Sequence, residues 1–129
     1  MRNTILLTAL LITSAFAPAC TCIARGVDQY RTDTRSLVET KNSAIKACYD
    51  RELAKDANLN GDVVINFTVE KKTGVITGAA VDSEASSAPP ALGDCIVQAV
   101  EGLTLDPYDQ RDGIATFTWR FKANPVPAA

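Results

Sequence analysis

The sequence predicts a two-layer α+β domain with the order helix, strand, strand, helix, strand. The three strands form an antiparallel sheet, and the two helices cover one face of it. Apolar residues recur at spacings of three and four in two segments, which indicates helices, and alternate with polar residues in two others, which indicates strands. In addition, each helical segment carries one cysteine on its apolar stripe, Cys48 or Cys95.

The first predicted helix runs from Asp33 to Ala57. Asp33 or Thr34 is suited to cap its start, and the stretch 58–61 is suited to end it, because Asn and Gly accept the left-handed backbone of a helix stop. Its apolar stripe consists of Leu37, Val38, Ile45, Cys48, Tyr49 and Leu53.

Strict alternation predicts the first and third strands, and the second is predicted as the return strand after a turn. Residues 63–69 and 75–81 form a hairpin around a turn at 71–74, and residues 114–121 form the third strand. We expect the aromatic face of the third strand to belong to the core; it consists of Ala115, Phe117, Trp119 and Phe121.

The second predicted helix begins at Pro90, since proline is tolerated in the first turn. Two helices side by side on one sheet can bring Cys48 and Cys95 to the separation that a disulfide needs. In the chain-entropy model, such a bridge stabilises the fold by about 4 kcal/mol. Two buried, reduced cysteines are the alternative, which an oxidising compartment disfavours.

The first 19 residues have the features of an export signal. Arg2 precedes a short apolar run at 5–16, and Ala17-Pro18-Ala19 supplies small residues at a cleavage point. The run is shorter than a membrane-spanning helix requires. Cleavage would make Cys20 the first residue, a position that resembles the lipidation site of bacterial lipoproteins.

A diacylglycerol on Cys20 would hold the exported protein on a membrane surface, in the periplasm or at the outer membrane. Ordinary secretion after the same cleavage is the alternative. Residues 20–32 are then expected to be a tether, residues 33–122 the domain, and residues 123–129 a frayed tail. Cys22 either stays free, pairs between chains, or disturbs the bridge.

Charge and composition argue against several classes of function. Removing residues 1–19 takes away one of 13 basic and none of 15 acidic residues, so the net charge is −3, and no basic stripe favours nucleic acid. The chain has no histidine, the usual general base and zinc ligand. We therefore expect no catalytic residue, no metal and no cofactor.

Three local patterns suggest chemistry and are better interpreted as structure. The stretch 56–61 matches the start of a calcium loop, but Phe67 stands where that loop needs a glutamate. The aspartates of the stretch 106–112 are expected in a solvated loop, and the serines at 83–87 have no base to activate them.

The spacing of several residues resembles a known family. The residues are Ile45-x-x-Cys48-Tyr49, Leu53, the alternating run from Leu59 to Val69, Gly74-x-Ile76, Val81-x-Ser83, Cys95-Ile96-x-x-Val100 and Phe117-x-Trp119-x-Phe121. They look like the C-terminal domain of the myxobacterial AgmX and PglI proteins, a TonB-like module. The resemblance covers about Ile45 to Phe121.

This resemblance implies a non-catalytic periplasmic binding domain of the TonB and TolA fold group. In that group the last strand is a free edge, and a protein or peptide partner adds a strand to it. The corresponding edge here carries Ile114, Thr116, Thr118 and Arg120. We expect a lipid-anchored binding module of the cell envelope; the alternative is a structural or assembly lipoprotein that acts through self-association.

Overall fold

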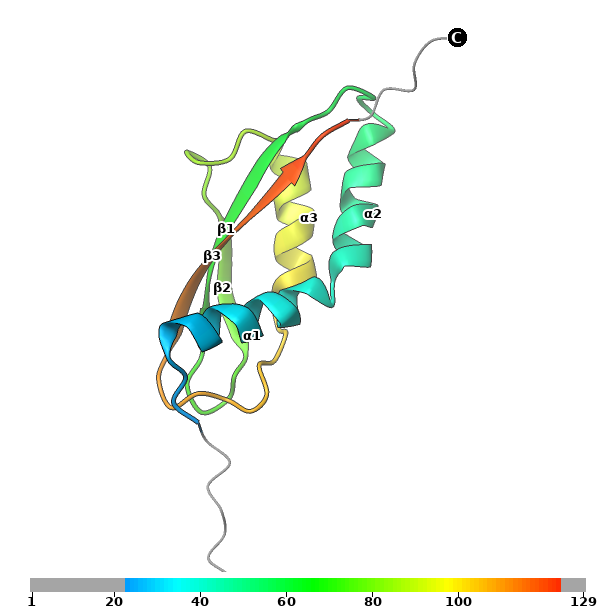
Figure 1. Cartoon of the computed structure of the whole chain (residues 1–129). Coiled ribbons are helices and arrows are strands. Elements are labelled where there is room, and N and C mark those ends of the chain that lie inside the picture. The colour runs from blue at the N-terminus through cyan, green and yellow to red at the C-terminus, as the bar shows by residue number, and fades with distance from the viewer. Residues whose placement is uncertain (1–22, 124–129) are drawn as a thin grey trace, which may run out of the picture.

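The computed structural model describes residues 23–123, and its elements are arranged as Figure 1 shows. The fold is α+β, with a three-stranded antiparallel sheet, as expected from the sequence. The described chain has three helices rather than the two expected. In order, the elements are α1 (Val27–Glu39), α2 (Asn42–Leu53), β1 (Gly61–Val69), β2 (Ile76–Val81), α3 (Pro90–Val100) and β3 (Gly113–Phe121).

The sheet has the order β2-β1-β3, so β1 lies in the centre. β1 and β3 pair without a break, from Gly61 opposite Phe121 to Val69 opposite Gly113. The pairing of β1 with β2 shifts by one residue, and the extra residue lies in β2 beside Gly78, whose φ is 63°. Glycine adopts this backbone easily, which lets the strand bulge.

The core lies between the sheet and the helices. α3 packs on β1 and β2, α2 packs on α3, and α1 crosses the lower end of this layer (Figure 1). From Val63 to Val69, every second residue of β1 points into this layer and is buried. The largest side chains with almost no exposed surface are Ile65, Ile76, Leu92, Ile96, Val38, Val63, Val69 and Val100.

The single helix expected at 33–57 is two helices, and this part of the prediction is wrong. The break lies at Thr40, whose N–H and hydroxyl both turn back to the carbonyl of Leu37. No apolar residue larger than alanine occurs between Val38 and Ile45, so no large side chain on this stretch requires burial. The chain changes direction there and α2 aligns with α3 instead of continuing α1 (Figure 1).

The tether expected at 20–32 is also wrong over its described part. α1 begins at Val27, and the segment before it packs on the domain. Ile23 forms an isolated parallel β-bridge with Asp109, and Arg25 is 4% exposed. Asp33 and Thr34, the expected caps, lie inside α1. Tyr30 donates its N–H to the carbonyl of Gly26, which forms the first turn instead.

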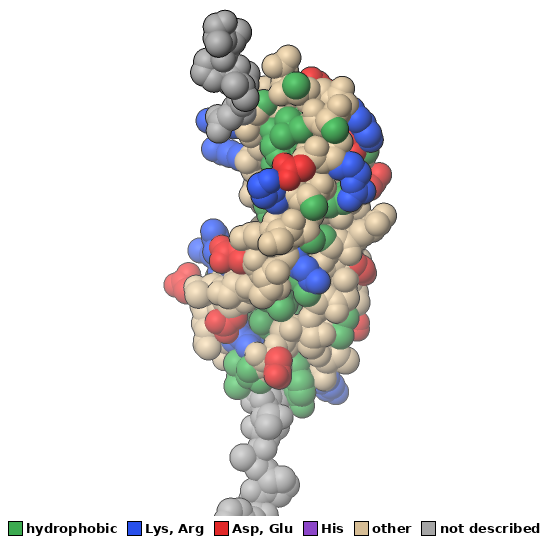
Figure 2. All heavy atoms as spheres, turned by 90° about the vertical axis from the view of Figure 1, so that its right-hand side faces the viewer, with side chains coloured by type: hydrophobic (Ala, Val, Ile, Leu, Met, Phe, Trp, Pro, Cys, Tyr) green, Lys and Arg blue, Asp and Glu red, His purple; other side chains and the backbone are tan. Residues whose placement is uncertain are grey.

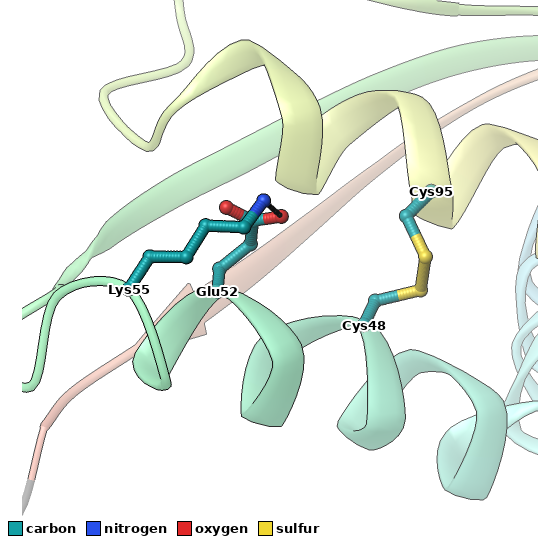
Figure 3. The surroundings of a disulfide bond; sticks show 4 residues. All are labelled: Cys48, Glu52, Lys55 and Cys95. Atoms are coloured by element: carbon teal, nitrogen blue, oxygen red, sulfur yellow. Dashed lines mark hydrogen bonds and ion pairs between the residues drawn. A yellow bond between two sulfur atoms is a disulfide. The ribbon is translucent and has the colours of Figure 1, made fainter.

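The predicted disulfide is confirmed. Cys48 of α2 and Cys95 of α3 are joined, with 5.9 Å between their Cα atoms (Figure 3). One turn further along α2, Glu52 is 9% exposed and accepts a hydrogen bond of 3.1 Å from Nζ of Lys55. The disulfide between Cys48 and Cys95 fixes the contact between α2 and α3 in the middle of the helix layer.

The aromatic face of β3 packs against the core without being enclosed by it. Phe117 contacts Phe67 at 5.7 Å and Trp119 at 5.8 Å between ring centroids, and Phe121 stacks on Tyr49 of α2 at 4.7 Å. The two central aromatics, Phe117 and Trp119, are nevertheless only half-buried. The reason is that α3 lies over β1 and β2 and leaves β3 at the margin.

Three expectations fall outside the described residues: the signal segment 1–19, the lipidated Cys20 with the neighbouring Cys22, and most of the tail 123–129. Within residues 23–123, no helix has the length and apolar character needed to cross a membrane.

Candidate partner-binding edge on strand β3

The sheet has two outer edges, and the one on β2 is covered. Ile76 donates its N–H to the carbonyl of Leu103 at 2.7 Å and accepts a hydrogen bond from the N–H of Gly102 at 3.0 Å. Further along, the N–H of Ala79 donates to the carboxylate of Glu101 at 2.9 Å. The segment after α3 therefore bonds the outward groups of Ile76 and the outward N–H of Ala79, and it occupies this part of the β2 edge.

The direction of the main-chain groups along β1 follows from its contacts on the β2 side. The carbonyl of Val64 accepts from the N–H of Asp82 at 2.8 Å, and the carbonyl of Asp62 accepts from the N–H of Ser87 at 2.9 Å. In an antiparallel ladder, consecutive residues direct their N–H and C=O groups to opposite sides. The even-numbered residues of β1 therefore face β2, and the odd-numbered ones face β3.

The same alternation assigns the main chain of β3. The β3 residues opposite the odd-numbered positions of β1 direct their N–H and C=O groups inward; they are Gly113, Ala115, Phe117, Trp119 and Phe121. The residues between them direct these groups away from the sheet. These outward residues are Ile114, Thr116, Thr118 and Arg120.

The four outward residues are those that the resemblance indicated, and their main chain is open. Within residues 23–123, their N–H and C=O groups make no hydrogen bond outside the pairing with β1. Their side chains are exposed, and Ile114 reaches 81%. The Thr116 hydroxyl donates to Oδ1 of Asn66 at 2.6 Å, which helps to hold β3 on β1.

A groove runs beside this edge. Residues 114–118 of β3 form one wall and the first half of α1 forms the other, around a volume of about 510 Å³. Val27, Arg31 and Arg35 follow one another at intervals of four on the α1 wall, so they belong to one stripe of that helix. Val27, 76% exposed, and Ile114 face the same groove and are the large apolar side chains with the greatest exposure in the described chain.

Two hydroxyls at the floor of the groove lack hydrogen bonds among the described residues. They belong to Tyr30 and Thr34, and Thr34 is 1% exposed. Burial raises the pKa of the Tyr30 hydroxyl. The Tyr30 ring lies directly on Gly113, where any side chain would collide with it. This contact sets how closely α1 approaches the start of β3.

The position of α1 depends on a buried cluster that the sequence did not indicate. Nε of Arg25 donates to Oδ2 of Asp33 at 2.7 Å, while the Arg25 N–H donates to Oδ2 of Asp109 at 2.8 Å. Nη2 of Arg111 donates to the Arg25 carbonyl at 3.0 Å. The residues before α1 are thereby fixed to the loop before β3.

Asp109 is the ionised centre of this cluster. Its Oδ1 accepts the Arg111 N–H at 3.1 Å, and Nη1 of Arg25 lies 3.9 Å from its Oδ2. Burial, the largest single effect, favours the neutral carboxyl, but the two main-chain N–H groups and the two guanidinium groups outweigh it. Together they hold the pKa of Asp109 below its usual value.

The expectation of a solvated loop at 106–112 is therefore wrong at Asp109, which is 4% exposed, although Asp106 and Asp112 are exposed. Asp109 joins the segment before α1 to the loop before β3. Sequence separation hid this cluster, because Arg25 and Asp109 lie 84 positions apart. The one available signal was the charge of Arg25 in a stretch with no periodicity.

The other candidate patterns also have structural roles. Oδ1 of Asp56 accepts the N–H of Asn58 at 3.0 Å, as in a turn, and Phe67 is buried in β1. The hydroxyls of Ser86 and Ser87 accept the N–H groups of Val64 and Asp62 at 2.9 and 2.8 Å. The two hydroxyls thus bond main-chain N–H groups of β1 at positions that lie beyond the end of β2.

Residues 23–123 contain no metal-binding cluster, and the face drawn in Figure 2 has no patch of like charges. Within residues 23–123, no group of three His, Cys, Asp or Glu side chains could hold a metal ion. Figure 2 shows positive and negative side chains interspersed over the helix-covered face. This distribution does not favour binding to a nucleic acid on that face.

Comparison with protein-family models, with curated proteins and with solved structures finds no significant match for this chain.

Proposed function

We propose that this protein is a non-catalytic binding module of the cell envelope. A protein or peptide partner adds a strand to β3 in this proposal, and a lipid on Cys20 holds the module on a membrane facing the periplasm. The AgmX and PglI resemblance and the signal-like first 19 residues support the location. The open edge of β3 supports the mode of binding.

The single observation behind this proposal is the difference between the two edges of the sheet. On β2, the outward groups of Ile76 and the N–H of Ala79 are bonded to the segment 101–103, whereas the outward main-chain groups of β3 make no hydrogen bond with any residue of 23–123. A long, unprotected edge is a template for another strand. The uninterrupted pairing of β3 with β1 means that no β-bulge interrupts this edge.

Thr118→Pro tests the edge directly. The outward N–H of Thr118 is lost in this variant, whereas Thr118→Val keeps the N–H and the β-branched shape. Proline is tolerated where the strand N–H faces solvent, so β3 should persist, which circular dichroism and thermal unfolding would check. We expect an envelope partner captured by the wild type and by Thr118→Val to be lost with Thr118→Pro; equal capture by all three proteins contradicts edge pairing.

The lipid anchor has a separate test. The intact mass of the protein extracted from membranes should include a diacylglycerol, and a Cys20→Ser variant should lack it. An unmodified mass for the wild type would contradict the anchor and leave the edge proposal standing.

Self-association is the second candidate, because two copies can pair through the same edge. The exposed Ile114 and Val27 beside that edge favour it. Sedimentation over a range of concentrations distinguishes the candidates: a dimer that Thr118→Pro dissociates supports self-association, and a monomer at high concentration excludes it.

A further inference from the structure

The groove between α1 and β3 differs in charge from the rest of the chain. Its lining includes two arginines, Arg31 and Arg35, and no acidic residue among the described ones. The full chain, in contrast, has a net charge of −2. A strand added to β3 at 114–118 would have one of its faces beside this positive wall.

Neither arginine is neutralised by a strong ion pair. Nη1 of Arg31 lies 3.8 Å from Asp28, and the two side chains are 67% and 100% exposed. Water and salt screen such a pair, so it contributes little. Arg35 makes no ion pair with any residue of the described chain. Both guanidinium groups therefore remain able to bind a carboxylate of a partner.

The remaining acidic residues of α1 lie away from the groove. Asp33 is on the other side of the helix, where it accepts the hydrogen bond from Arg25. Glu39 is the last residue of α1 and does not line the groove. At the outer end of the groove, Val27 and Ile114 provide exposed apolar surface next to the arginines.

From this arrangement we infer that the partner segment is an extended acidic peptide. Its strand pairs with residues 114–118, its carboxylates face Arg31 and Arg35 of α1, and an apolar side chain covers Val27 and Ile114. This inference rests on the proposed function, since it describes what is added to the edge of β3. Charge complementarity of this kind selects the partner and speeds its association.

The probes for a test are three blocked octapeptides of one alternating β-forming sequence. They carry Glu, Gln or Lys at the same alternate positions, so that all substituted side chains lie on one face of the strand. Chemical-shift titration of the isotope-labelled, processed protein detects binding even when it is weak. We expect the Glu peptide to bind about fivefold or more tightly than the Gln peptide at low salt, with the Lys peptide weakest.

Two variants attribute this preference to the groove. Arg31→Gln with Arg35→Gln should make the Glu and Gln peptides bind equally and leave the affinity for the Gln peptide unchanged. Arg51→Gln is the matched control, because Arg51 is an exposed arginine of α2 outside the groove. It should preserve the preference.

The outcomes separate this inference from the proposed function. If Thr118→Pro abolishes binding of all peptides but the three bind the wild type equally, the acidic preference is overturned and edge pairing stands. If the Glu peptide is preferred and Thr118→Pro changes nothing, edge pairing is overturned, and with it the pose inferred here. No binding of any peptide contradicts both.

Discussion

The main-chain N–H of Arg25 donates a hydrogen bond of 2.8 Å to the buried carboxylate of Asp109. The other oxygen of Asp109 accepts the N–H of Arg111, so one side chain joins the segment before α1 to the loop before β3. Both walls of the groove begin at this point. The geometry of the candidate site therefore depends on a buried contact at one end of the groove.

Asp109→Ala should lower the free energy of unfolding by about 3 kcal/mol. The variant leaves the N–H groups of Arg25 and Arg111 without their acceptor, and it removes the carboxylate that lies 3.9 Å from Nη1 of the buried Arg25. Unpaired buried polar groups and charges are costly. Asp106→Ala, in the exposed part of the same loop, should change stability by less than about 0.5 kcal/mol. Chemical denaturation measures both, and equal effects would show that the cluster does not hold the loop.

Asp109 should also make stability depend on acidic pH. Its pKa in the folded protein is lowered, so the stabilisation is present above the unfolded pKa of about 3.9 and is lost as the pH falls through the folded value. The gap in unfolding free energy between wild type and Asp109→Asn should therefore be constant near neutral pH and shrink below about pH 4. Denaturation curves at a series of pH values test this; a gap that persists at lower pH contradicts it.

Loss of the disulfide should destabilise the fold by about 4 kcal/mol in the chain-entropy model, because Cys48 and Cys95 are 47 positions apart. The double variant Cys48→Ala, Cys95→Ala should unfold at lower denaturant concentration than the wild type. A reducing agent should shift the wild type toward the double variant and leave the variant unchanged. If reduction leaves the wild-type transition in place, the bridge does not stabilise the domain.

Gly74 and Gly78 form a matched pair for testing close packing. Both have positive φ, 73° and 63°, so alanine carries a similar backbone cost at each. Alanine at Gly74 would also collide with the carbonyl of Leu105, whereas the position beside Gly78 is open. Thermal unfolding should show Gly74→Ala to be less stable than Gly78→Ala by about 2 kcal/mol. Equal stabilities would mean that the main chain at Leu105 moves away from the added methyl group without loss of stability.

The sequence by itself determined the elements whose pattern is local. Alternation predicted β1 and β3, and the turn after β1 predicted β2 as the returning strand. The apolar stripe predicted α3, and the placement of Cys48 and Cys95 on two helical stripes predicted their bridge. These signals are readable because burial on one face of a strand or helix fixes the spacing of apolar residues.

The tertiary structure alone decided the break between α1 and α2, the docking of the first described residues, and the covering of the β2 edge. Arg25 with Asp109 and Ile76 with Leu103 are contacts between segments distant in sequence, and no local periodicity encodes them. The sequence also could not show that α3 covers β1 and β2 but not β3. Phe117 and Trp119 on β3 are therefore only half-buried. Which edge stays open depends on where α3 packs and where the chain goes after it, and both are settled only when the layers assemble.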